Sequence, residues 1–363
     1  MEISLCMIVK NEEKTLATCL DSIHDLVDEI NIVDTGSTDR TVEIAKKYTD
    51  RIFFFEWIND FGAARNFSFS KATKDYIMWL DADDIIYEKD RQKFIKLKET
   101  MEPDVDYIVT PYVGNYDEMG KPVNVANRER IVKRKNNFKW EGVLHESIEF
   151  AGKGIFNDLQ ITHNHLYSDE AYIDKSLRNF DILNQKFLSG GELSNKDIYY
   201  YALMLNGMER CEESNEWFEK FISTLPEGRA PFYDVYTTMH KNYIAIGDYE
   251  KAFLTLHNVE SHYNNRSEYY CTLGDFFKDT LKDAETAINY YNKAIKCEGN
   301  TISGQLNIAF YYEIPYQNLG ACYLSLKDYK SALENYKKAL EYKPVDSDLR
   351  NLVEKLEKIA KLV

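Results

Sequence analysis

The sequence of 363 residues lacks the signatures of several common protein classes. Its six cysteines contain no C-x-x-C pair, which argues against a zinc ribbon, a thioredoxin motif or a disulfide framework and indicates buried thiols in a reducing compartment. No apolar run approaches the roughly 18 residues that a membrane helix needs. An acidic residue and a strand-like run follow Met1 directly, so we expect no signal peptide. These absences predict a soluble, cytoplasmic protein without a membrane span.

Positive charge is also scarce. The chain has 45 Lys and Arg against 60 Asp and Glu, a formal net charge of −15, which argues against nucleic acid or an anionic membrane as a partner. The motifs G-x-x-x-x-G-K-[ST] and G-x-G-x-x-G are absent, so phosphates are not held by a glycine-rich loop as in kinases or dehydrogenases. A phosphorylated ligand would therefore need a bound cation to offset the acidic side chains.

The first part of the chain alternates short β-rich runs with segments of helical periodicity. The predicted strands cover residues 3–10, 29–34, 51–56, 75–80 and 106–112, and the predicted helices lie near 12–24, 39–48, 61–72 and 88–100. Strict alternation predicts an α/β domain with a Rossmann-like, mostly parallel sheet and crossover helices. In such sheets ligands bind at the carboxyl ends of the strands.

From about residue 170 the sequence is helical in character. Residues 316–344 match the tetratricopeptide pattern, with further copies predicted at 239–256 and, more weakly, near 201–221 and 273–294. We therefore predict two domains, 1–170 and 171–363. Repeats of this kind form a concave surface that suits an extended peptide, and the same surface also suits self-association into a homodimer.

Polar residues gather where the predicted strands end. Four motifs mark these ends: "VKNEE" (9–13), "VDTGSTDRT" (33–41), "NDFGAARN" (59–66) and "LDADD" (80–84). Helix capping explains part of this pattern, since Asn11, Asp39 and Asp60 each precede a predicted helix.

Capping leaves other residues of these motifs unexplained. Asp34 and Asp81 lie on the strand side of their loops, and Arg65 lies in the first turn of a predicted helix, where the helix dipole disfavours a cation. A pocket with an acid for a nucleobase N–H (Asp34), a carboxylate pair for a metal (Asp81 and Asp83) and an arginine for phosphate (Arg65) suits a nucleoside diphosphate. The divalent cation, Mg²⁺ or Mn²⁺, neutralises the diphosphate.

Two later segments add candidate residues. In "RERIVKRKNNFKWEGVLHESI" (128–148) we expect Lys133, Arg134 and Lys135 to belong to a solvated edge hairpin. His145 and Glu146 follow an apolar strand and point to opposite faces, so one of them faces the pocket.

The segment "DLQITHNHLY" (158–167) then ends another strand with His163 and His165 on one face. A lone histidine is usually a satisfied side chain, but two at a strand end are candidate metal ligands.

The four strand-end motifs, in this order, resemble the amino-terminal half of a family 2 glycosyltransferase of the GT-A fold, over roughly residues 1–170. The resemblance implies that Asp34 contacts the nucleobase, Asp81 the ribose and Asp83 the metal. Together with the other strand-end residues, the nucleotide-sugar contacts then comprise Val9, Asn11, Glu12, Asp34, Asp39, Asp60, Arg65, Asp81, Ala82 and Arg130.

With "G-x-x-HE", "HNHLY" and helical repeats behind them, the motifs also resemble the sublancin-type peptide glycosyltransferases that modify bacteriocins. This resemblance implies that His163 binds the metal, with His165 as the alternative, because the sequence lacks the glycine expected after the Asn between them. It implies transfer of a sugar from a nucleoside-diphosphate sugar, chiefly a UDP-sugar, to a Ser, Thr or Cys of a peptide or protein.

Inverting transfer needs a base opposite the leaving diphosphate. Glu146 is the candidate, with His145 orienting it or contacting substrate, and Asp84 is the runner-up. The metal and Arg65, with help from Arg130, would stabilise the charge on the leaving group. Two alternatives remain: transfer to a cell-surface glycan or a lipid-linked acceptor, and an inactive repeat scaffold.

Overall fold

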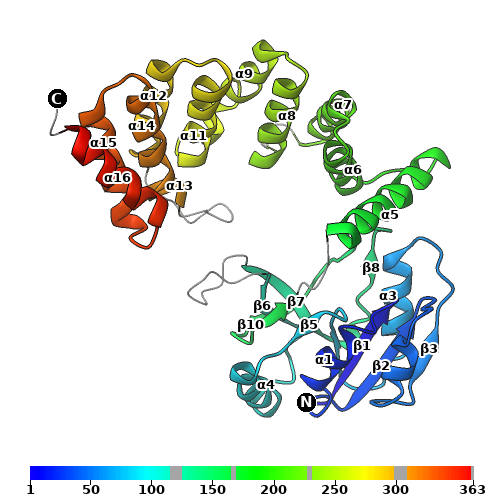
Figure 1. Ribbon diagram of the computed structural model, residues 1–363. Helices are drawn as coiled ribbons and strands as arrows, with labels where there is room; N and C mark the ends of the chain where they lie inside the picture. Colours follow the sequence, from blue (N-terminus) through cyan, green and yellow to red (C-terminus); the bar gives the residue numbers. More distant parts are fainter. Residues whose placement is uncertain (115–124, 165–168, 227–230, 298–308, 361–363) are drawn as a thin grey trace. The chain divides into compact units, whose positions relative to one another are not determined.

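The computed structural model describes the chain except residues 115–124, 165–168, 227–230, 298–308 and 361–363. The chain divides into two compact units, Met1–Asp197 and Ile198–Val363 (Figure 1). The first unit is an α/β domain and the second is built from helices, which confirms the predicted fold class. The domain boundary at residue 170 stays a prediction.

A mixed, mostly parallel sheet forms the centre of the first unit. Its nine strands follow the order β3-β2-β1-β4-β7-β6-β11-β5, with β10 paired to β6, and β8 and β9 form a separate pair. The strands are β1 (Ile3–Val9), β2 (Glu29–Asp34), β3 (Ile52–Phe54), β4 (Tyr76–Trp79), β5 (Asp84–Ile85), β6 (Tyr107–Val113), β7 (Val125–Lys133), β8 (Trp140–Glu141), β9 (Ser147–Ile148), β10 (Gly154–Phe156) and β11 (Ile161–His163). Strands β3, β2, β1 and β4 are parallel, so their carboxyl ends meet at one edge.

Helices accompany this sheet in the predicted alternation. They are α1 (Leu16–Asp21), α2 (Thr41–Ala45), α3 (Phe61–Phe69), α4 (Glu88–Thr100) and α5 (Asp169–Leu188). The core contains side chains of β1 together with apolar residues of α1 and α4, including Leu5, Met7, Leu16 and Phe94. The strand runs are apolar because helices cover them, as is usual for parallel sheets.

Strand β7 corrects one prediction. The basic run was expected on a solvated edge hairpin, but β7 lies between β4 and β6 and is antiparallel to both. Lys133 is 8% exposed, and its Nζ donates to the carbonyl oxygen of Pro103. Arg134 and Lys135 follow β7 in an exposed 3₁₀ turn, Arg134–Asn136, so the expectation of a solvated segment holds for these two alone. A long basic side chain can enter a sheet interior where its terminal group finds an oxygen partner.

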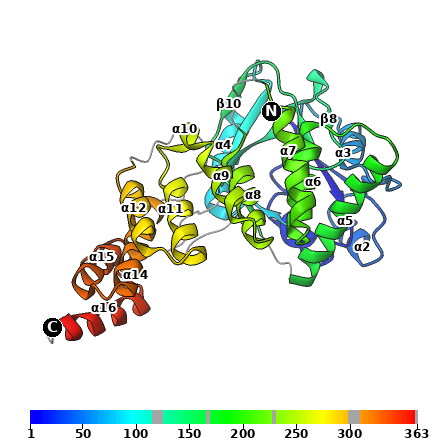
Figure 2. The same cartoon turned by 90° about the horizontal axis from the view of Figure 1, so that it is seen from above.

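The second unit consists of helix pairs. Its elements are α6 (Asn195–Gly207, which begins in the first unit), α7 (Cys211–Ser223), α8 (Tyr233–Ala245), α9 (Tyr249–His257), α10 (Glu260–Tyr263), α11 (Ser267–Asp275), a π-helical turn (Phe276–Thr280), α12 (Ala284–Ala294), α13 (Ala309–Tyr312), α14 (Ile314–Ser325), α15 (Tyr329–Tyr342) and α16 (Ser347–Ala360). Helices α14, α15 and α16 lie side by side in both views (Figure 1, Figure 2).

Four of these pairs share one turn geometry. The residue before the second helix's N-cap is left-handed in each pair, with φ of 59° at Glu209, 82° at Gly247, 58° at Lys282 and 60° at Lys327. In the last three pairs an Asp follows and caps the second helix by accepting from a backbone N–H three residues on. The common turn supports the four repeat copies predicted from the sequence.

Small residues let the paired helices approach closely. The ring of Tyr336 lies against Gly320, and the ring of Tyr291 lies against Gly274 in the preceding repeat unit. A Cβ at Gly320 would come within 2.8 Å of the Tyr336 ring. Gly320 and Tyr336 both belong to the predicted repeat 316–344, and their close contact is the helix packing that such a repeat needs.

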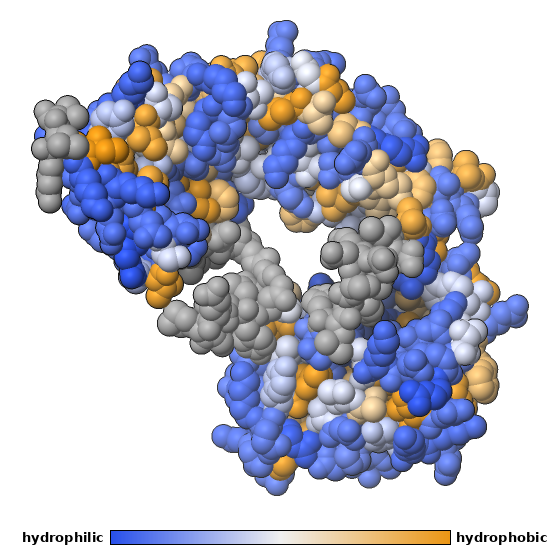
Figure 3. Space-filling view, viewed as in Figure 1, coloured by the Kyte–Doolittle hydropathy of each residue, from blue (hydrophilic) through white to orange (hydrophobic). Residues whose placement is uncertain are grey.

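Hydrophilic residues predominate on the face of the molecule shown in Figure 3, and apolar residues form small, separate patches. Among the residues that the structure describes, no helix combines the length and the apolar character needed to cross a bilayer.

Replacing Gly320 with Ala should destabilise the second unit, because the buried Tyr336 ring must move to admit the methyl group. We expect a loss of about 1–3 kcal/mol in the free energy of unfolding, measured by urea denaturation. Gly207→Ala is the matched control, since a Cβ there meets no atom within 4 Å. Equal stability of the two variants would contradict this packing argument.

Glu29 should make the stability of the first unit depend on acid. Burial works to raise the pKa of Glu29, but hydrogen bonds from Asn31, Thr73 and Ser4 outweigh it and lower the pKa to about 2. The contribution of Glu29 is therefore present above its unfolded pKa of about 4.3 and is lost as pH falls towards 2. Glu29→Gln should reduce stability at pH 7 and reduce its loss between pH 5 and 2, measured by thermal denaturation across that range. If Glu29→Gln and the wild type lost the same stability between pH 5 and 2, this prediction would be contradicted.

Candidate active site

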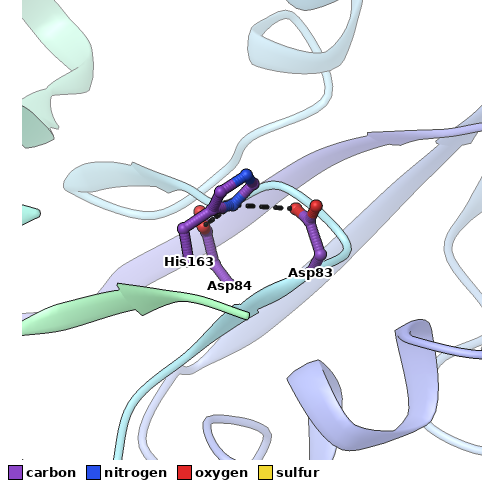
Figure 4. Close-up of side chains that lie close together, drawn as sticks. All are labelled: Asp83, Asp84 and His163. Carbon is purple, nitrogen blue, oxygen red and sulfur yellow. Dashed lines mark hydrogen bonds and ion pairs between the residues drawn. The ribbon is translucent and has the colours of Figure 1, made fainter. Parts of the chain in front are cut away.

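Two aspartates and a histidine meet where β4 leads into β5 (Figure 4). The antiparallel pairing of β11 with β5 sets His163 opposite Asp84. The Nδ1 atom of His163 lies 3.3 Å from Asp83 Oδ1 and 3.4 Å from Asp84 Oδ1. The three side chains come from two segments about 80 residues apart, so tertiary pairing and not local sequence creates the group. His165 lies outside the described residues.

This donor set fits a divalent cation. Two carboxylates and one imidazole are ligands that Mn²⁺ accepts, and cis ligands of such an ion lie about 3 Å apart. Burial works to lower the pKa of His163, but its hydrogen bonds to Asp83 and Asp84 outweigh it and raise the pKa to about 9. A positive charge is thus favoured between these carboxylates, and a metal ion would take the place of the ring proton.

Asp84 is held in place on both of its oxygen atoms. Its Oδ1 accepts from the Tyr112 hydroxyl at 2.9 Å, and its Oδ2 accepts from the Asp81 backbone N–H at 2.9 Å. Oδ2 also pairs with Arg130 at 3.0 Å, and both side chains of this ion pair are at most 1% exposed. Asp84, the runner-up base of the sequence analysis, therefore lies on the metal side of the site.

Two arginines lie against the indole ring of Trp79. The Cζ atom of Arg130 lies 3.8 Å from the ring centroid and that of Arg65 lies 4.9 Å from it. Arg65 donates to Asp81 Oδ1 at 2.8 Å and to Glu146 Oε1 at 2.5 Å. Burial works to raise the pKa of Asp81, but the charges of Arg65 and Arg130 outweigh it and hold the pKa below its ordinary value. The guanidinium of Arg65 thus links the candidate ribose ligand to the candidate base.

The candidate base stands in a turn. His145 and Glu146 were expected to follow a strand with alternating faces, but they lie in the turn that joins β8 to β9, with His145 at φ 51°. The alternation argument is therefore wrong here, although Glu146 does face Arg65 and the site.

The loops after β1 and β2 are joined by hydrogen bonds. Asn11, at φ 56°, accepts from the Thr38 backbone N–H at 2.8 Å, and Asp39 accepts from the Glu13 N–H at 3.1 Å. Asp34 is 2% exposed and accepts from the backbone N–H groups of its own loop. Such contacts organise the loops, and contact with a nucleotide stays a prediction for these residues.

The remaining candidates occupy the same edge of the sheet. Val9 pairs with Asp34 across β1 and β2, Ala82 is buried within the acidic loop, and Glu12 accepts from the Thr15 hydroxyl at 2.7 Å. Asp60 caps α3 by accepting from the Ala63 N–H at 2.8 Å, the capping role expected for it.

Sequence reasoning missed the aromatic and amide residues that hold the charged groups. Trp79 and Tyr112 stack on Arg130, and Asn66 binds the backbone of Trp140. Trp79 directly precedes the motif "LDADD", and Asn66 ends the motif "NDFGAARN", so both lie in or next to motifs already singled out.

These features define the chain's class as an α/β domain of GT-A type with a charged site at its strand ends, followed by helical repeats. Residues 4–159 match the model for "Glycosyl transferase family 2", and residues 267–300 and 315–345 match models for "Tetratricopeptide repeat". The chain therefore carries a family 2 glycosyltransferase domain with C-terminal tetratricopeptide repeats.

Individual relatives are distant. SPbeta prophage-derived glycosyltransferase SunS of Bacillus subtilis (strain 168) is 26% identical over 76% of this chain, and the chain spans 65% of its length. Glycosyltransferase GlyG of Streptococcus pneumoniae is 25% identical over 61% of this chain and 77% of its own. The crystal structure of S. aureus TarS in complex with UDP aligns with 70% of this chain, and the alignment includes 90% of the TarS chain. The sequence identity is 16% and the TM-score is 0.39, so this similarity carries no argument about function.

Removing Asp83 should weaken cation binding. Asp83→Ala removes one negatively charged ligand of the candidate metal group. We therefore expect the Kd for Mn²⁺, measured by calorimetry on the purified chain, to rise at least about tenfold. Asp25→Ala is the control, because that carboxylate is paired with Arg91, is half exposed and is not one of the three residues of the candidate metal group. An unchanged Kd in the Asp83 variant would count against the metal site.

Proposed function

We propose that the protein is an inverting, divalent-metal-dependent glycosyltransferase that moves a sugar from a nucleoside-diphosphate sugar, chiefly a UDP-sugar, to a Ser, Thr or Cys side chain of a peptide or protein. The observation that carries this proposal is the convergence of Asp83, Asp84 and His163 beside Asp81, with Glu146 held by the same arginine as Asp81. The proposed displacement requires a set of side chains that can bind a cation and, next to it, a separate carboxylate that can act as the base.

The donor would bind along the carboxyl ends of β1, β2 and β4. Asp34, Asp39, Asn11, Glu12 and the backbone of Val9 would hold the base and ribose, with Asp60 and Ala82 at the edges of the pocket. Asp81 would hold the ribose from the metal side. When bound at Asp83 and His163, the cation neutralises the diphosphate.

The displacement itself moves one bond and one proton. The acceptor oxygen or sulfur bonds to the anomeric carbon as the bond from that carbon to the diphosphate breaks, and Glu146 takes the acceptor's proton. Arg65 orients Glu146 and, with Arg130 behind it, adds positive potential on the leaving-group side. His145, next to Glu146 in the turn, would contact the acceptor.

A peptide or protein acceptor is supported by the resemblance to peptide-modifying transferases and by the tetratricopeptide repeats. Repeats of this type commonly present a surface for an extended chain. They equally support self-association, and a homodimer remains part of the proposal.

A thermal-shift panel tests donor and metal together. UDP-glucose, UDP-N-acetylglucosamine, UDP-galactose and GDP-mannose would each be added with Mn²⁺, with Mg²⁺ or with EDTA. We expect one UDP-sugar to raise Tm by several degrees with a divalent ion and by much less in EDTA, because ligand binding stabilises the folded state. The Asp83→Ala variant should lose the shift. No shift with any sugar nucleotide would favour the scaffold alternative.

Glu146→Gln tests the base. The variant keeps the size of the side chain but cannot accept the proton, so we expect transfer to fall about 10²- to 10⁴-fold while the Kd for UDP stays the same. Transfer would be followed by mass spectrometry of a peptide mixture containing Ser, Thr and Cys. Wild-type turnover in the variant would remove Glu146 from this role.

A further inference from the structure

One face of helix α3 contacts the loop that carries Glu146. Phe61, Gly62, Arg65 and Asn66 are spaced i, i+1, i+4 and i+5, which places them on the same side of the helix. We call residues 140–146, from β8 to the candidate base, the base loop. Contacts from these four residues join this face of α3 to the base loop, and they account for four of the eight residues of the "NDFGAARN" motif.

The contacts from Asn66 and Phe61 are to the loop's backbone. Asn66 Nδ2 donates to the Trp140 carbonyl oxygen at 2.9 Å, and Asn66 Oδ1 accepts from the Trp140 N–H at 2.9 Å. The Phe61 N–H donates to the Val143 carbonyl oxygen at 2.9 Å. Both polar atoms of the Asn66 amide are therefore committed to the base loop.

Gly62 and Arg65 complete this set of contacts. A Cβ at Gly62 would come within 2.5 Å of the Gly142 carbonyl oxygen, so the loop passes closer to the helix than any side chain would allow. Arg65 reaches past the loop backbone to Glu146 Oε1 at 2.5 Å. The helix thus holds both the backbone at the start of the base loop and the carboxylate at its end.

We propose that Asn66 and Gly62 are positioning residues, which act on the reaction through Glu146 by fixing the base loop. This inference rests on the proposed function of Glu146 as the base. The donor-side residues Asp81, Asp83 and His163 come from β11 and the connection between β4 and β5, not from the base loop. Displacing the loop should therefore slow the chemical step and leave nucleotide and metal binding intact.

Asn66→Asp is the first test. The variant keeps the size of the side chain but replaces the donor to the Trp140 carbonyl with a carboxylate oxygen, which repels it. With the UDP-sugar selected by the thermal-shift panel, we expect kcat for UDP release to fall about 10- to 100-fold, as misplacement of a catalytic group by about 1 Å does. The Kd values for UDP and Mn²⁺ should stay within about twofold of wild type.

Ser70→Ala is the matched control for this variant. Ser70 is the exposed C-cap of the same helix, and its hydroxyl donates to the Phe67 carbonyl oxygen within α3, away from the base loop. Its kcat should equal that of wild type. Wild-type kcat in the Asn66→Asp variant, or a weakening of UDP binding that matches its loss of kcat, would overturn the inference.

Gly62→Ala tests the same idea by a different physical change and remains informative if Asn66→Asp does not fold. Alanine is the better helix former, so α3 should persist while the added methyl group displaces Gly142. We expect the same separation of effects, a lower kcat with unchanged Kd for UDP.

A double-mutant cycle with Glu146→Gln separates positioning from a general structural role. If Asn66 acts through Glu146, the double variant should be no slower than Glu146→Gln alone, whereas independent effects would multiply. Multiplied losses would overturn the inference. If Glu146→Gln itself keeps full turnover, the proposed base is wrong, which is a distinct outcome from a failure of the positioning role.

Discussion

The buried ion pair between Arg130 and Asp84 is the interaction on which the site depends. Three carboxylates within four residues repel one another and resist burial, and an uncompensated buried charge costs several kcal/mol. Arg130 neutralises Asp84 from inside the sheet, and Arg65 neutralises Asp81 from α3. Both guanidinium groups also lie against the ring of Trp79. This arrangement lets an acidic loop end a buried strand without unfolding it.

The three aspartates of this loop differ in their partners. Asp81 and Asp84 each have an arginine partner, whereas the carboxylate of Asp83 lies against the imidazole of His163. A cation entering there would replace a proton between groups already in position. Glu146 accepts from Nε of the Arg65 guanidinium, whereas Asp81 pairs with Nη2 of the same group. The groups proposed for the donor and the group proposed for the acceptor therefore lie on different elements, with Arg65 in contact with both Asp81 and Glu146.

Local sequence patterns were sufficient for most of the fold. Alternating apolar runs predicted β1, β2, β4 and β6, and the tetratricopeptide spacing predicted the α14–α15 pair. The patterns failed where partners lie far apart in the chain. A basic run suggests an exposed edge unless the buried carbonyl oxygen that receives Lys133 is known. The approach of Arg65 to Glu146, 81 residues later, likewise depends on tertiary packing and has no periodic signal.

The left-handed joint shared by four helix pairs has a consequence for how such a chain changes over evolutionary time. Each joint is defined within its own few residues, and the contacts of one pair are repeated by the next. Duplication or loss of a segment of about 34 residues would therefore lengthen or shorten the array while preserving every turn. The length of the repeat region can therefore change by whole repeats without a change in the residues of the candidate site at the strand ends.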